Sequence, residues 1–259
     1  MNYPYRSALV TGASSGLGRE FARALAARGV SVVLVARRAD RLEELAVELA
    51  GRHGVSAEVL AADLGEDKEL RRVEERLADP ARPVDLLVSN AGYDVSGLFA
   101  EHDPTVPCGE IAVNVLAPVR LCRAVLGGML ARGRGGVLFV SSAVSSMPLP
   151  RSAVYGASKA FITSFAESLH MEADGHGVNI TSVTAGLMHT EFHDNAGIDT
   201  AGMPKSAWMP AARVAHAGLD AVAAGKPIVL PGLFNKLQAP VYKVMPRWLL
   251  RAMVRRFYR

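Results

Sequence analysis

Short apolar runs that alternate with longer helix-periodic segments constrain the fold of this chain most strongly. The runs are hydrophobic almost without interruption, as expected of parallel strands that are covered on both faces. They are Ala8–Val10, Val32–Ala36, Ala57–Ala61, Leu86–Val88, Val137–Val140, Ile180–Val183 and Ile228–Leu230. Helices are expected near residues 16–28, 40–52, 66–78, 109–132, 152–174 and 211–224. The alternation predicts an α/β fold, with a doubly wound parallel sheet of about seven strands that is flanked by helices.

The composition is that of a single globular domain. Of the 259 residues, 50% are hydrophobic and 21% are charged, which is typical of a folded protein rather than a disordered chain. The sequence has no linker-like stretch or internal repeat, so we expect one domain over residues 1–259. Cys108 and Cys122 lack the spacing of metal ligands or of a disulfide scaffold, and we therefore expect no metal site and a reducing, cytoplasmic location. The first strand begins near Ser7, which leaves no room for a cleavable signal peptide.

The positive charge is concentrated in the C-terminal tail, residues 235–259. This tail holds seven of the 29 Lys and Arg residues and no acidic residue, so 22 basic residues remain against 25 acidic ones elsewhere. A nucleic-acid-binding face on the domain is therefore not expected. Arg251 and Arg255 lie on a different helical face from the apolar residues of the tail, which are Trp248, Leu250, Met253, Val254 and Phe257. The pattern predicts a basic amphipathic helix, which either attaches peripherally to anionic membrane lipid or packs on its own domain or a partner subunit and covers the pocket.

A glycine-rich turn follows the first strand and leads directly into a helical segment. Its sequence is Thr11-Gly12-Ala13-Ser14-Ser15-Gly16-Leu17-Gly18. Glycines allow a tight turn and a close approach of the backbone, and the N–H groups at the start of the helix can then bind a pyrophosphate. The spacing Gly-x-x-x-Gly-x-Gly differs from the common Gly-x-Gly-x-x-Gly fingerprint, but its position predicts the dinucleotide site of a Rossmann-like sheet. The candidate cofactor ligands are Gly12, Ser14, Ser15, Gly16, Leu17 and Gly18.

The end of the second strand bears on the choice of cofactor. A protein that binds NAD usually places an acidic side chain here for the adenosine ribose, but this chain has Ala36 followed by Arg37 and Arg38. Two guanidinium groups suit the 2′-phosphate of NADP, so the sequence favours NADP, with NAD as the alternative and Arg37 as the better candidate ligand. Asp40 is a weaker candidate for the ribose, because Asp40 and Glu43 fit a capping box at the start of the next helix.

Tyr155 and Lys159 lie one turn apart in a predicted helix and therefore share one of its faces. An isolated tyrosine, with a pKa of about 10, is a poor base near neutral pH. A nearby cation lowers that pKa toward the operating range, so the pair predicts a general acid/base. Tyr-x-x-x-Lys pairs also occur on solvated helices. The residues at two strand ends, however, strengthen the interpretation of Tyr155 as an acid/base. Ser141 and Ser142 end the fifth strand and Asn90-Ala91-Gly92 ends the fourth, at the sheet edge where open α/β folds bind ligands.

These features together resemble the short-chain dehydrogenase/reductase family over nearly the whole chain. The matching residues are the glycine-rich turn, Asp63, Asn90-Ala91-Gly92, Asn114, Ser142, Tyr155 and Lys159. The spacing of the turn is similar to that of the compact single-domain branch. Sugar-nucleotide epimerases typically carry Gly-x-x-Gly-x-x-Gly, which the serine at position 15 disfavours. The resemblance implies an oxidoreductase that transfers a hydride between a nicotinamide cofactor and a carbonyl or alcohol group.

The resemblance also implies a role for each catalytic residue. Tyr155 would donate a proton to the carbonyl oxygen during reduction, or remove it during alcohol oxidation. Ser142 would polarise and position that oxygen. Lys159 would lower the pKa of Tyr155 and bind the nicotinamide ribose, and Asn114 would hold a water through which protons reach the solvent.

Further cofactor contacts are implied by the same resemblance. Asp63 and Leu64 would line the adenine pocket, and Asn90 would stabilise the sheet edge beside the cofactor. The family usually has Pro-Gly after the sixth strand, whereas this chain has Ala185-Gly186. Gly186 can still form the bend, and Thr190, at the expected offset, could bond the nicotinamide amide. The missing proline loosens the geometry of this loop.

The candidate substrate pocket is mostly apolar, which favours a lipophilic ketone, aldehyde or secondary alcohol over a polyol or sugar phosphate. Methionine and aromatic residues at such positions are equally consistent with ordinary core packing. His189 and His193 flank the loop after the sixth strand and are assigned no role. The pocket candidates are Tyr93, Val144, Met147, Leu149, Leu187, Met188, Trp208 and Met209.

Two functions remain to be distinguished. The first is an NADP-dependent carbonyl reductase or alcohol dehydrogenase that acts on a small molecule. The second is a dinucleotide-sensing binding protein that keeps the fold without turnover, but such a protein has no need of Ser142, Tyr155, Lys159 and Asn114 together. The family resemblance also implies a homo-oligomer, either a dimer or a tetramer, that associates through the helices near 109–132 and 152–174.

Overall fold

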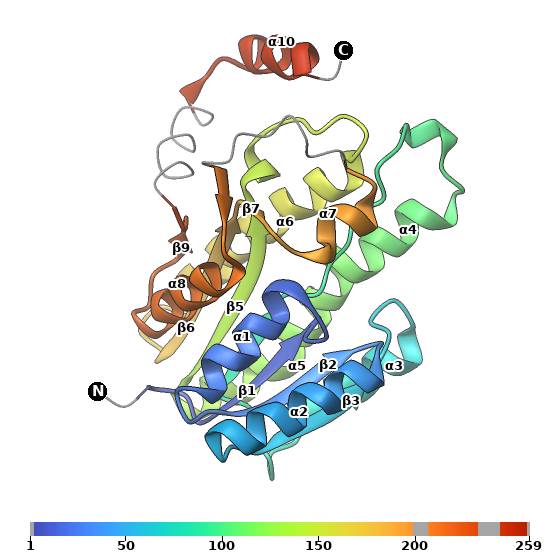
Figure 1. The fold of residues 1–259 in the computed structure, drawn as a ribbon. Coiled ribbons are helices and arrows are strands. Elements are labelled where there is room, and N and C mark those ends of the chain that lie inside the picture. Colours follow the sequence, from blue (N-terminus) through green and yellow to red (C-terminus); the bar gives the residue numbers. More distant parts are fainter. Residues whose placement is uncertain (1–2, 199–206, 233–243, 258–259) are drawn as a thin grey trace.

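The structure, a computed structural model, describes residues 3–198, 207–232 and 244–257 (Figure 1). Its main sheet has seven strands in the order β3-β2-β1-β4-β5-β6-β9, and every neighbouring pair is parallel. The predicted doubly wound parallel sheet is therefore confirmed. The strands are β1 (Ser7–Thr11), β2 (Ser31–Ala36), β3 (Ala57–Ala61), β4 (Leu86–Ser89), β5 (Gly135–Ser142), β6 (Val178–Ala185) and β9 (Ile228–Val229).

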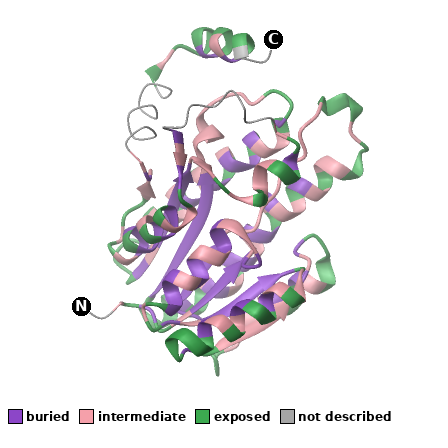
Figure 2. Ribbon diagram, in the orientation of Figure 1, coloured by how far each residue is buried: buried purple, intermediate pink, exposed green. Residues whose placement is uncertain are grey.

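Helices cover both faces of this sheet, as Figure 1 shows. One buried cluster joins α1, α2 and α8 to the sheet, and a second joins α3, α5 and α6 to its other face. The five inner strands β1, β2, β4, β5 and β6 are almost entirely buried (Figure 2), which explains their apolar sequences, whereas the edge strands β3 and β9 are only partly buried. The helices are α1 (Gly16–Ala26), α2 (Ala39–His53), α3 (Asp67–Ala78), α4 (Thr105–Ile111), α5 (Ala117–Arg132), α6 (Ala153–Glu172), α7 (Glu191–Ala196), α8 (Ala211–Ala223) and α10 (Arg247–Phe257).

The helix predicted near 109–132 begins earlier, at Thr105, and contains a π-helical turn, η2 (Ala112–Leu116), between α4 and α5. By length and composition alone, Thr105–Arg132 could cross a membrane. However, Leu121, Val125 and Met129 are buried in the cluster that covers the sheet. The packing therefore accounts for the apolar character of its inner face.

The start of α2 differs from the prediction. The helix begins at Ala39, and its N-cap is Arg38, whose side chain makes no capping hydrogen bond. Asp40 lies in the first turn, so the predicted capping box with Glu43 is wrong. Only Arg37 and Arg38 lie between the end of β2 at Ala36 and the start of α2 at Ala39, so Asp40 is already inside the helix, two residues after the cap. Its carboxylate is still well placed to interact with the helix dipole.

Two features near the loop after β6 were not predicted. The short strands β7 (Leu187–Met188) and β8 (Trp208–Met209) pair in parallel and form a second, two-stranded sheet. A short helix, α7, begins directly after Thr190, which caps it by accepting a hydrogen bond from the N–H of Phe192. These elements lie beyond the carboxyl end of β6, on the side of the molecule that carries the site residues.

In the C-terminal tail, α10 confirms the predicted helix over Arg247–Phe257, while residues 235–243 lie outside the described residues. Leu250 and Val254 are buried, as expected if the helix packs on the remainder of the protein. Trp248, in contrast, is 66% exposed and shares the outer surface with Arg251 and Arg255. The apolar residues of the tail are thus divided between a buried stripe and an exposed one.

Candidate active site

The ends of β1 and β4 are connected through Thr11. Its hydroxyl accepts hydrogen bonds from the N–H groups of Asn90 (2.9 Å) and Ala91 (3.0 Å). The Asn90 amide in turn donates to the Thr11 carbonyl at 2.8 Å. Asn90 therefore joins the ends of β1 and β4 at this sheet edge. Thr11 belongs to the motif, but its hydrogen bonds to β4 become evident only in the structure.

The glycine-rich turn packs tightly against this edge. A Cβ atom on Gly18 would lie 2.1 Å from the Gly12 carbonyl oxygen and 2.6 Å from the Asn90 amide nitrogen, so only glycine fits there. Gly12 has a φ of 68°, in the region that favours glycine. The close approach places the N-terminus of α1 at the sheet edge, where its first N–H groups have no partner within the helix. This arrangement fits the pyrophosphate of a dinucleotide.

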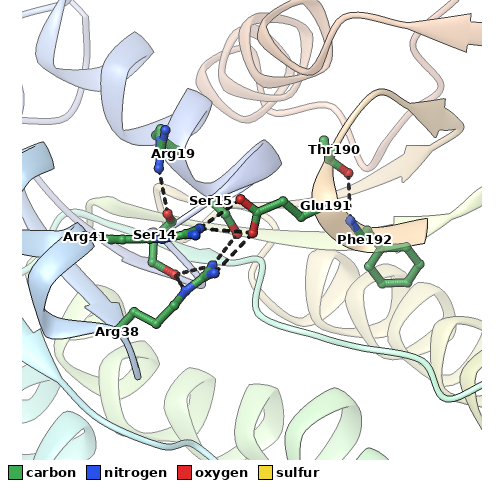
Figure 3. Close-up of polar contacts among 8 residues, drawn as sticks. All are labelled: Ser14, Ser15, Arg19, Arg38, Arg41, Thr190, Glu191 and Phe192. Atoms are coloured by element: carbon green, nitrogen blue, oxygen red, sulfur yellow. Dashed lines mark hydrogen bonds and ion pairs between the residues drawn. The ribbon is translucent and has the colours of Figure 1, made fainter. Parts of the chain in front are cut away.

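Arg38, rather than Arg37, lies at this turn (Figure 3). Its guanidinium group donates to the hydroxyls of Ser14 (3.1 Å) and Ser15 (2.8 Å). The Arg37 side chain is 75% exposed and approaches Asp63 at 3.7 Å instead. The sequence favoured Arg37 as the phosphate ligand. The position of two adjacent residues after a strand does not show which side chain turns toward the glycine-rich loop, and only the structure decides this.

The remaining adenine-side candidates lie after β3. The Asp63 carboxylate accepts a hydrogen bond from the N–H of Gly65 at 2.9 Å, and the Asp63 N–H donates to the carboxylate of Glu69. Leu64 is buried in the cluster that α3 and α5 form with the sheet. Asp63 is therefore held at the surface of the site, whereas Leu64 mainly anchors the loop.

Tyr155, Lys159 and Ser142 meet where the first turns of α6 pass the end of β5. The Lys159 ammonium donates to the Val140 carbonyl at 2.9 Å and lies 5.5 Å from the centroid of the Tyr155 ring. The hydroxyl of Ser142 faces the Tyr155 phenol closely enough to affect its pKa. Ser141 fixes the helix to the strand by donating to the Lys159 carbonyl at 2.9 Å. The two strand-end serines therefore have different roles.

Loss of hydration determines the protonation of this pair. Burial raises the pKa of the Tyr155 phenol well above its ordinary value, although the hydrogen bond from Ser142 lowers it. Burial also lowers the pKa of Lys159 to about 8. That Lys159 lowers the pKa of Tyr155 stays a prediction; in this structure the Lys159 ammonium donates to the Val140 carbonyl. The phenol is consequently protonated at neutral pH, as a proton donor must be.

Asn114 lies in the π-helical turn η2 and is 1% exposed. Its amide donates to the Tyr93 carbonyl at 2.8 Å, and its oxygen accepts from the Tyr93 N–H at 3.0 Å. A Cβ atom on Gly92 would lie 2.9 Å from the Asn114 oxygen and 3.3 Å from the Lys159 nitrogen. Gly92 thus allows Asn114 and Lys159 to approach each other. Such π-turns are frequent at functional sites.

The structure divides the pocket candidates into two groups. Met209 belongs to the hydrophobic core and Met188 packs against it, so for these two the alternative interpretation as core residues applies. The other candidates are partly buried beside the catalytic residues or in the loops that lead from them. These are Tyr93, Val144, Met147, Leu149, Leu187 and Trp208.

Three aromatic groups of the loop after β6 were given no role from the sequence: Phe192 was not named there, and His189 and His193 were left unassigned. Phe192 lies with its ring centroid 5.4 Å from that of Tyr155. His189 stacks on Trp208 at 4.4 Å, and His193 lies 5.3 Å from the same indole. The α7 segment is short and polar, so no periodicity indicated that Phe192 would face the catalytic tyrosine.

A buried carboxyl pair lies beside the catalytic residues and was also missed. Asp94 and Glu110 are 3% and 4% exposed. The N–H of Val95 donates to Glu110 at 3.1 Å, and the groups facing Asp94 are Glu110, Ser152 and His102. Burial raises the pKa of Asp94 above its ordinary value and that of Glu110 to about 7. Asp94 follows Asn90-Ala91-Gly92 closely and Glu110 lies four residues before Asn114, but neither belongs to a motif, and nothing in the sequence indicated that they would meet.

Comparisons with known proteins agree with this geometry. A family model described as short chain dehydrogenase matches residues 6–200. The chain is 35% identical over 183 residues to the very-long-chain 3-oxoacyl-CoA reductase of Anas platyrhynchos. The aligned region covers 68% of this chain and 57% of the relative. The chain therefore spans little more than half the length of that curated relative.

Two solved structures share the fold along almost their full length. A short-chain dehydrogenase from Sphingobium yanoikuyae in complex with NADPH has a TM-score of 0.83 and 31% identity, covering 93% of this chain and 96% of that one. The bulky-bulky ketone specific alcohol dehydrogenase from Comamonas testosteroni has a TM-score of 0.79 and 27% identity, covering 95% and 96%.

Proposed function

Because the chain belongs to the short-chain dehydrogenase/reductase family, we propose that it is an NADPH-dependent reductase of a lipophilic ketone or aldehyde. The family assignment supplies the reaction class, an oxidoreductase that acts on CH–OH and C=O groups. The observation that carries the finer proposal is the meeting of Ser142, Tyr155 and Lys159 at the end of β5. A protein that only senses a dinucleotide does not need a protonated phenol held by a serine hydroxyl.

In the proposed reduction, Tyr155 acts as the proton donor. NADPH, when bound, supplies a hydride to the carbonyl carbon. Ser142 donates a hydrogen bond to the carbonyl oxygen, and the Tyr155 phenol passes its proton to that oxygen as negative charge develops there. The raised pKa of Tyr155 keeps the proton on the phenol until that charge appears. Lys159, held by the Val140 carbonyl, then provides positive charge near the phenolate that remains.

The preference for NADPH rests on the charge at the glycine-rich turn. Arg38 contacts both Ser14 and Ser15, and Arg41 lies close enough to share a carboxylate with it. Two guanidinium groups can bind a 2′-phosphate through several N–H donors, whereas an unphosphorylated ribose leaves them without an anion. The similar structure from Sphingobium yanoikuyae, which contains NADPH, supports the same choice.

The substrate class is inferred from the partly buried apolar side chains beside Tyr155. Val144, Met147 and Leu149 follow β5, and Phe192 lies against the catalytic phenol. These groups favour a hydrophobic substituent over a sugar or phosphate. Relatives named as a very-long-chain 3-oxoacyl-CoA reductase and a bulky-bulky ketone specific alcohol dehydrogenase are consistent with such a substrate.

A ketone and aldehyde panel, followed at the nicotinamide absorbance with NADPH and NADH, tests the proposal. We expect turnover of hydrophobic carbonyls with NADPH, and a loss of about 10²- to 10⁴-fold in kcat/KM for Tyr155→Phe. Tyr3→Phe, which alters a hydroxyl bonded to the Leu219 carbonyl far from the site, serves as the matched control. Equal activity of Tyr155→Phe and wild type would remove the phenol from the mechanism, and equal use of NADH would refute the cofactor assignment.

A further inference from the structure

An ion-pair cluster joins the loop after β6 to the glycine-rich turn (Figure 3). The Glu191 carboxylate, at the first position of α7, accepts hydrogen bonds from Arg41 at 2.8 and 3.1 Å and from Arg38 at 3.1 Å. The two arginines belong to the β2–α2 connection and to α2, about 150 residues away in the sequence. The arginines lower the pKa of Glu191, so its carboxylate is ionised at neutral pH.

A second contact holds the same segment against the turn. Thr190 lies so close to Gly16 that a Cβ atom on the glycine would be 3.2 Å from the Thr190 Cβ. Thr190 therefore contacts the first residue of α1, and Glu191 contacts the first turn of α2. The side chain of Glu191 is 47% exposed, and ion pairs with such exposure contribute little to stability. The cluster is thus not required to hold the fold together.

We propose that Glu191 occupies the binding position of the 2′-phosphate of NADP and is displaced from Arg38 and Arg41 when that phosphate binds. The inference rests on the proposed use of NADPH. Guanidinium groups bind carboxylates and phosphates through the same paired N–H donors, so one anion can replace the other. A phosphate monoester carries a charge of about −1.5 to −2 near pH 7, against −1 for the carboxylate, so the two guanidinium groups attract it more strongly.

The displacement connects cofactor recognition with the substrate side of the site. Glu191 is followed directly by Phe192, whose ring lies 5.4 Å from that of Tyr155. His189 and His193, on either side of Glu191, both contact Trp208. Release of Glu191 therefore changes the position of groups next to the catalytic phenol. NADH has no 2′-phosphate and leaves Glu191 on its two arginines.

Binding of the two cofactors to Glu191→Gln tests the competition. The variant keeps the size of the side chain but removes the charge that holds it on the arginines. We expect NADPH to bind about threefold to tenfold more tightly than to wild type, in the range that two surface ion pairs can provide. NADH affinity should change much less. Asp194→Asn, with the same charge change one turn along α7, is the matched control and should behave as wild type.

Unchanged or weaker NADPH binding by Glu191→Gln would overturn the inference, because Glu191 would then be part of a clamp on the cofactor rather than its competitor. The proposed function is judged separately, by whether wild type prefers NADPH to NADH. A wild type with that preference and a variant without tighter binding would refute the competition alone. Thermal unfolding of both variants, expected to match wild type, checks that the fold is intact.

Fluorescence of Trp208 tests the linked movement without turnover. Trp248→Phe removes the second of the two tryptophans, so the emission comes from the indole that stacks on His189. Adenosine 2′,5′-bisphosphate should change this emission, while adenosine 5′-monophosphate, which has no 2′-phosphate, should leave it unchanged. When Glu191→Gln is combined with Trp248→Phe, the protein without nucleotide should already show the altered emission. Adenosine 2′,5′-bisphosphate should then cause no further change. An identical response to both nucleotides, or an unaltered response in Glu191→Gln, would contradict displacement by the phosphate.

Discussion

At Tyr155, the loss of hydration outweighs any attraction from the neighbouring ammonium group. The pKa of the phenol is raised, and that of Lys159 is lowered to about 8, since burial disfavours the charged form of each. The same cause acts on Glu110, whose carboxyl is surrounded by protein and faces Asp94. Residue-scale predictions for this protein therefore follow from burial first and from charge pairs second.

Glu110 makes stability depend on pH. Burial raises its pKa from 4.5 to about 7, so the folded protein holds this proton to higher pH than the unfolded chain does. Its contribution to stability is complete below about pH 4.5 and is lost as the pH rises through about 7. In Glu110→Gln, the unfolding temperature should decline less between these pH values. Glu44→Gln on the exposed face of α2 is the control, and parallel curves for Glu110→Gln and wild type would disprove the assignment.

At the scale of elements, two irregular features place the functional side chains. The π-helical turn η2 turns Asn114 inward between α4 and α5, where its amide satisfies both backbone groups of Tyr93. The short helix α7 brings Phe192 to Tyr155 and Glu191 to the two arginines of α2 and its cap. The turn η2 interrupts the α-helical geometry between α4 and α5, and α7 interrupts the loop after β6. Each of them determines the direction of a functional side chain.

Asn114→Ala should affect both stability and activity. It leaves the N–H and carbonyl of Tyr93 without the side chain that now pairs with them, at a cost of about 1–3 kcal/mol in the free energy of unfolding. Denaturant unfolding measures this loss, and kcat/KM should fall because Gly92 and Lys159 lose their neighbour. Asn179→Ala, which breaks a comparable bond to the Val222 carbonyl away from the site, is the control for stability alone. If both variants lose the same activity, Asn114 has no special part in the site.

At the scale of the whole molecule, two regions of the described surface carry exposed apolar side chains. Along α4, η2 and α5, apolar side chains remain exposed on the side away from the sheet, and Phe161 is exposed on α6. The outer side of α10 carries Trp248 among arginines. We propose that the first region mediates self-association and the second contacts anionic membrane lipid.

Self-association should depend on Leu116, which is 48% exposed in η2, and on its neighbours in α5 and α6. Leu116→Glu introduces a charge into this face and should shift the protein from a dimer or tetramer toward the monomer. Sedimentation velocity measures the change. Val47→Glu, at a residue 76% exposed on α2, is the matched control and should keep the assembly of wild type. A monomeric wild type would refute the proposal.

Membrane contact through α10 should depend on its arginines. Arg251 and Arg255 are exposed next to Trp248, a side chain suited to the interface between lipid and water. The double variant Arg251→Glu/Arg255→Glu should lose co-sedimentation with vesicles that contain anionic lipid, while Arg52→Glu/Arg213→Glu, with the same charge change on α2 and α8, should retain it. Equal pelleting of all three proteins would leave packing on the protein itself, through Leu250 and Val254, as the role of this helix.

Much of this protein was predictable from local sequence. The seven strands and the helices between them follow from the period of apolar residues, since burial on both faces demands apolar strands. The glycine-rich turn follows from sterics: at Gly18, a side chain would collide with the Gly12 carbonyl. The spacing of Ser142, Tyr155 and Lys159 indicated one site, because parallel strands end at the same edge and residues four apart share a helix face.

Other properties depend on contacts between distant segments, which only the tertiary structure decides. Arg38 rather than Arg37 meets Ser14 and Ser15, because the path of the chain after β2 determines which side chain turns inward. Glu191, the first residue of α7, contacts the same Arg38 although it is about 150 residues away in the sequence. The pKa values of Tyr155 and Glu110 depend likewise on what surrounds each group in space. Sequence periodicity records which face of an element is buried, whereas these contacts depend on how the elements are placed against one another.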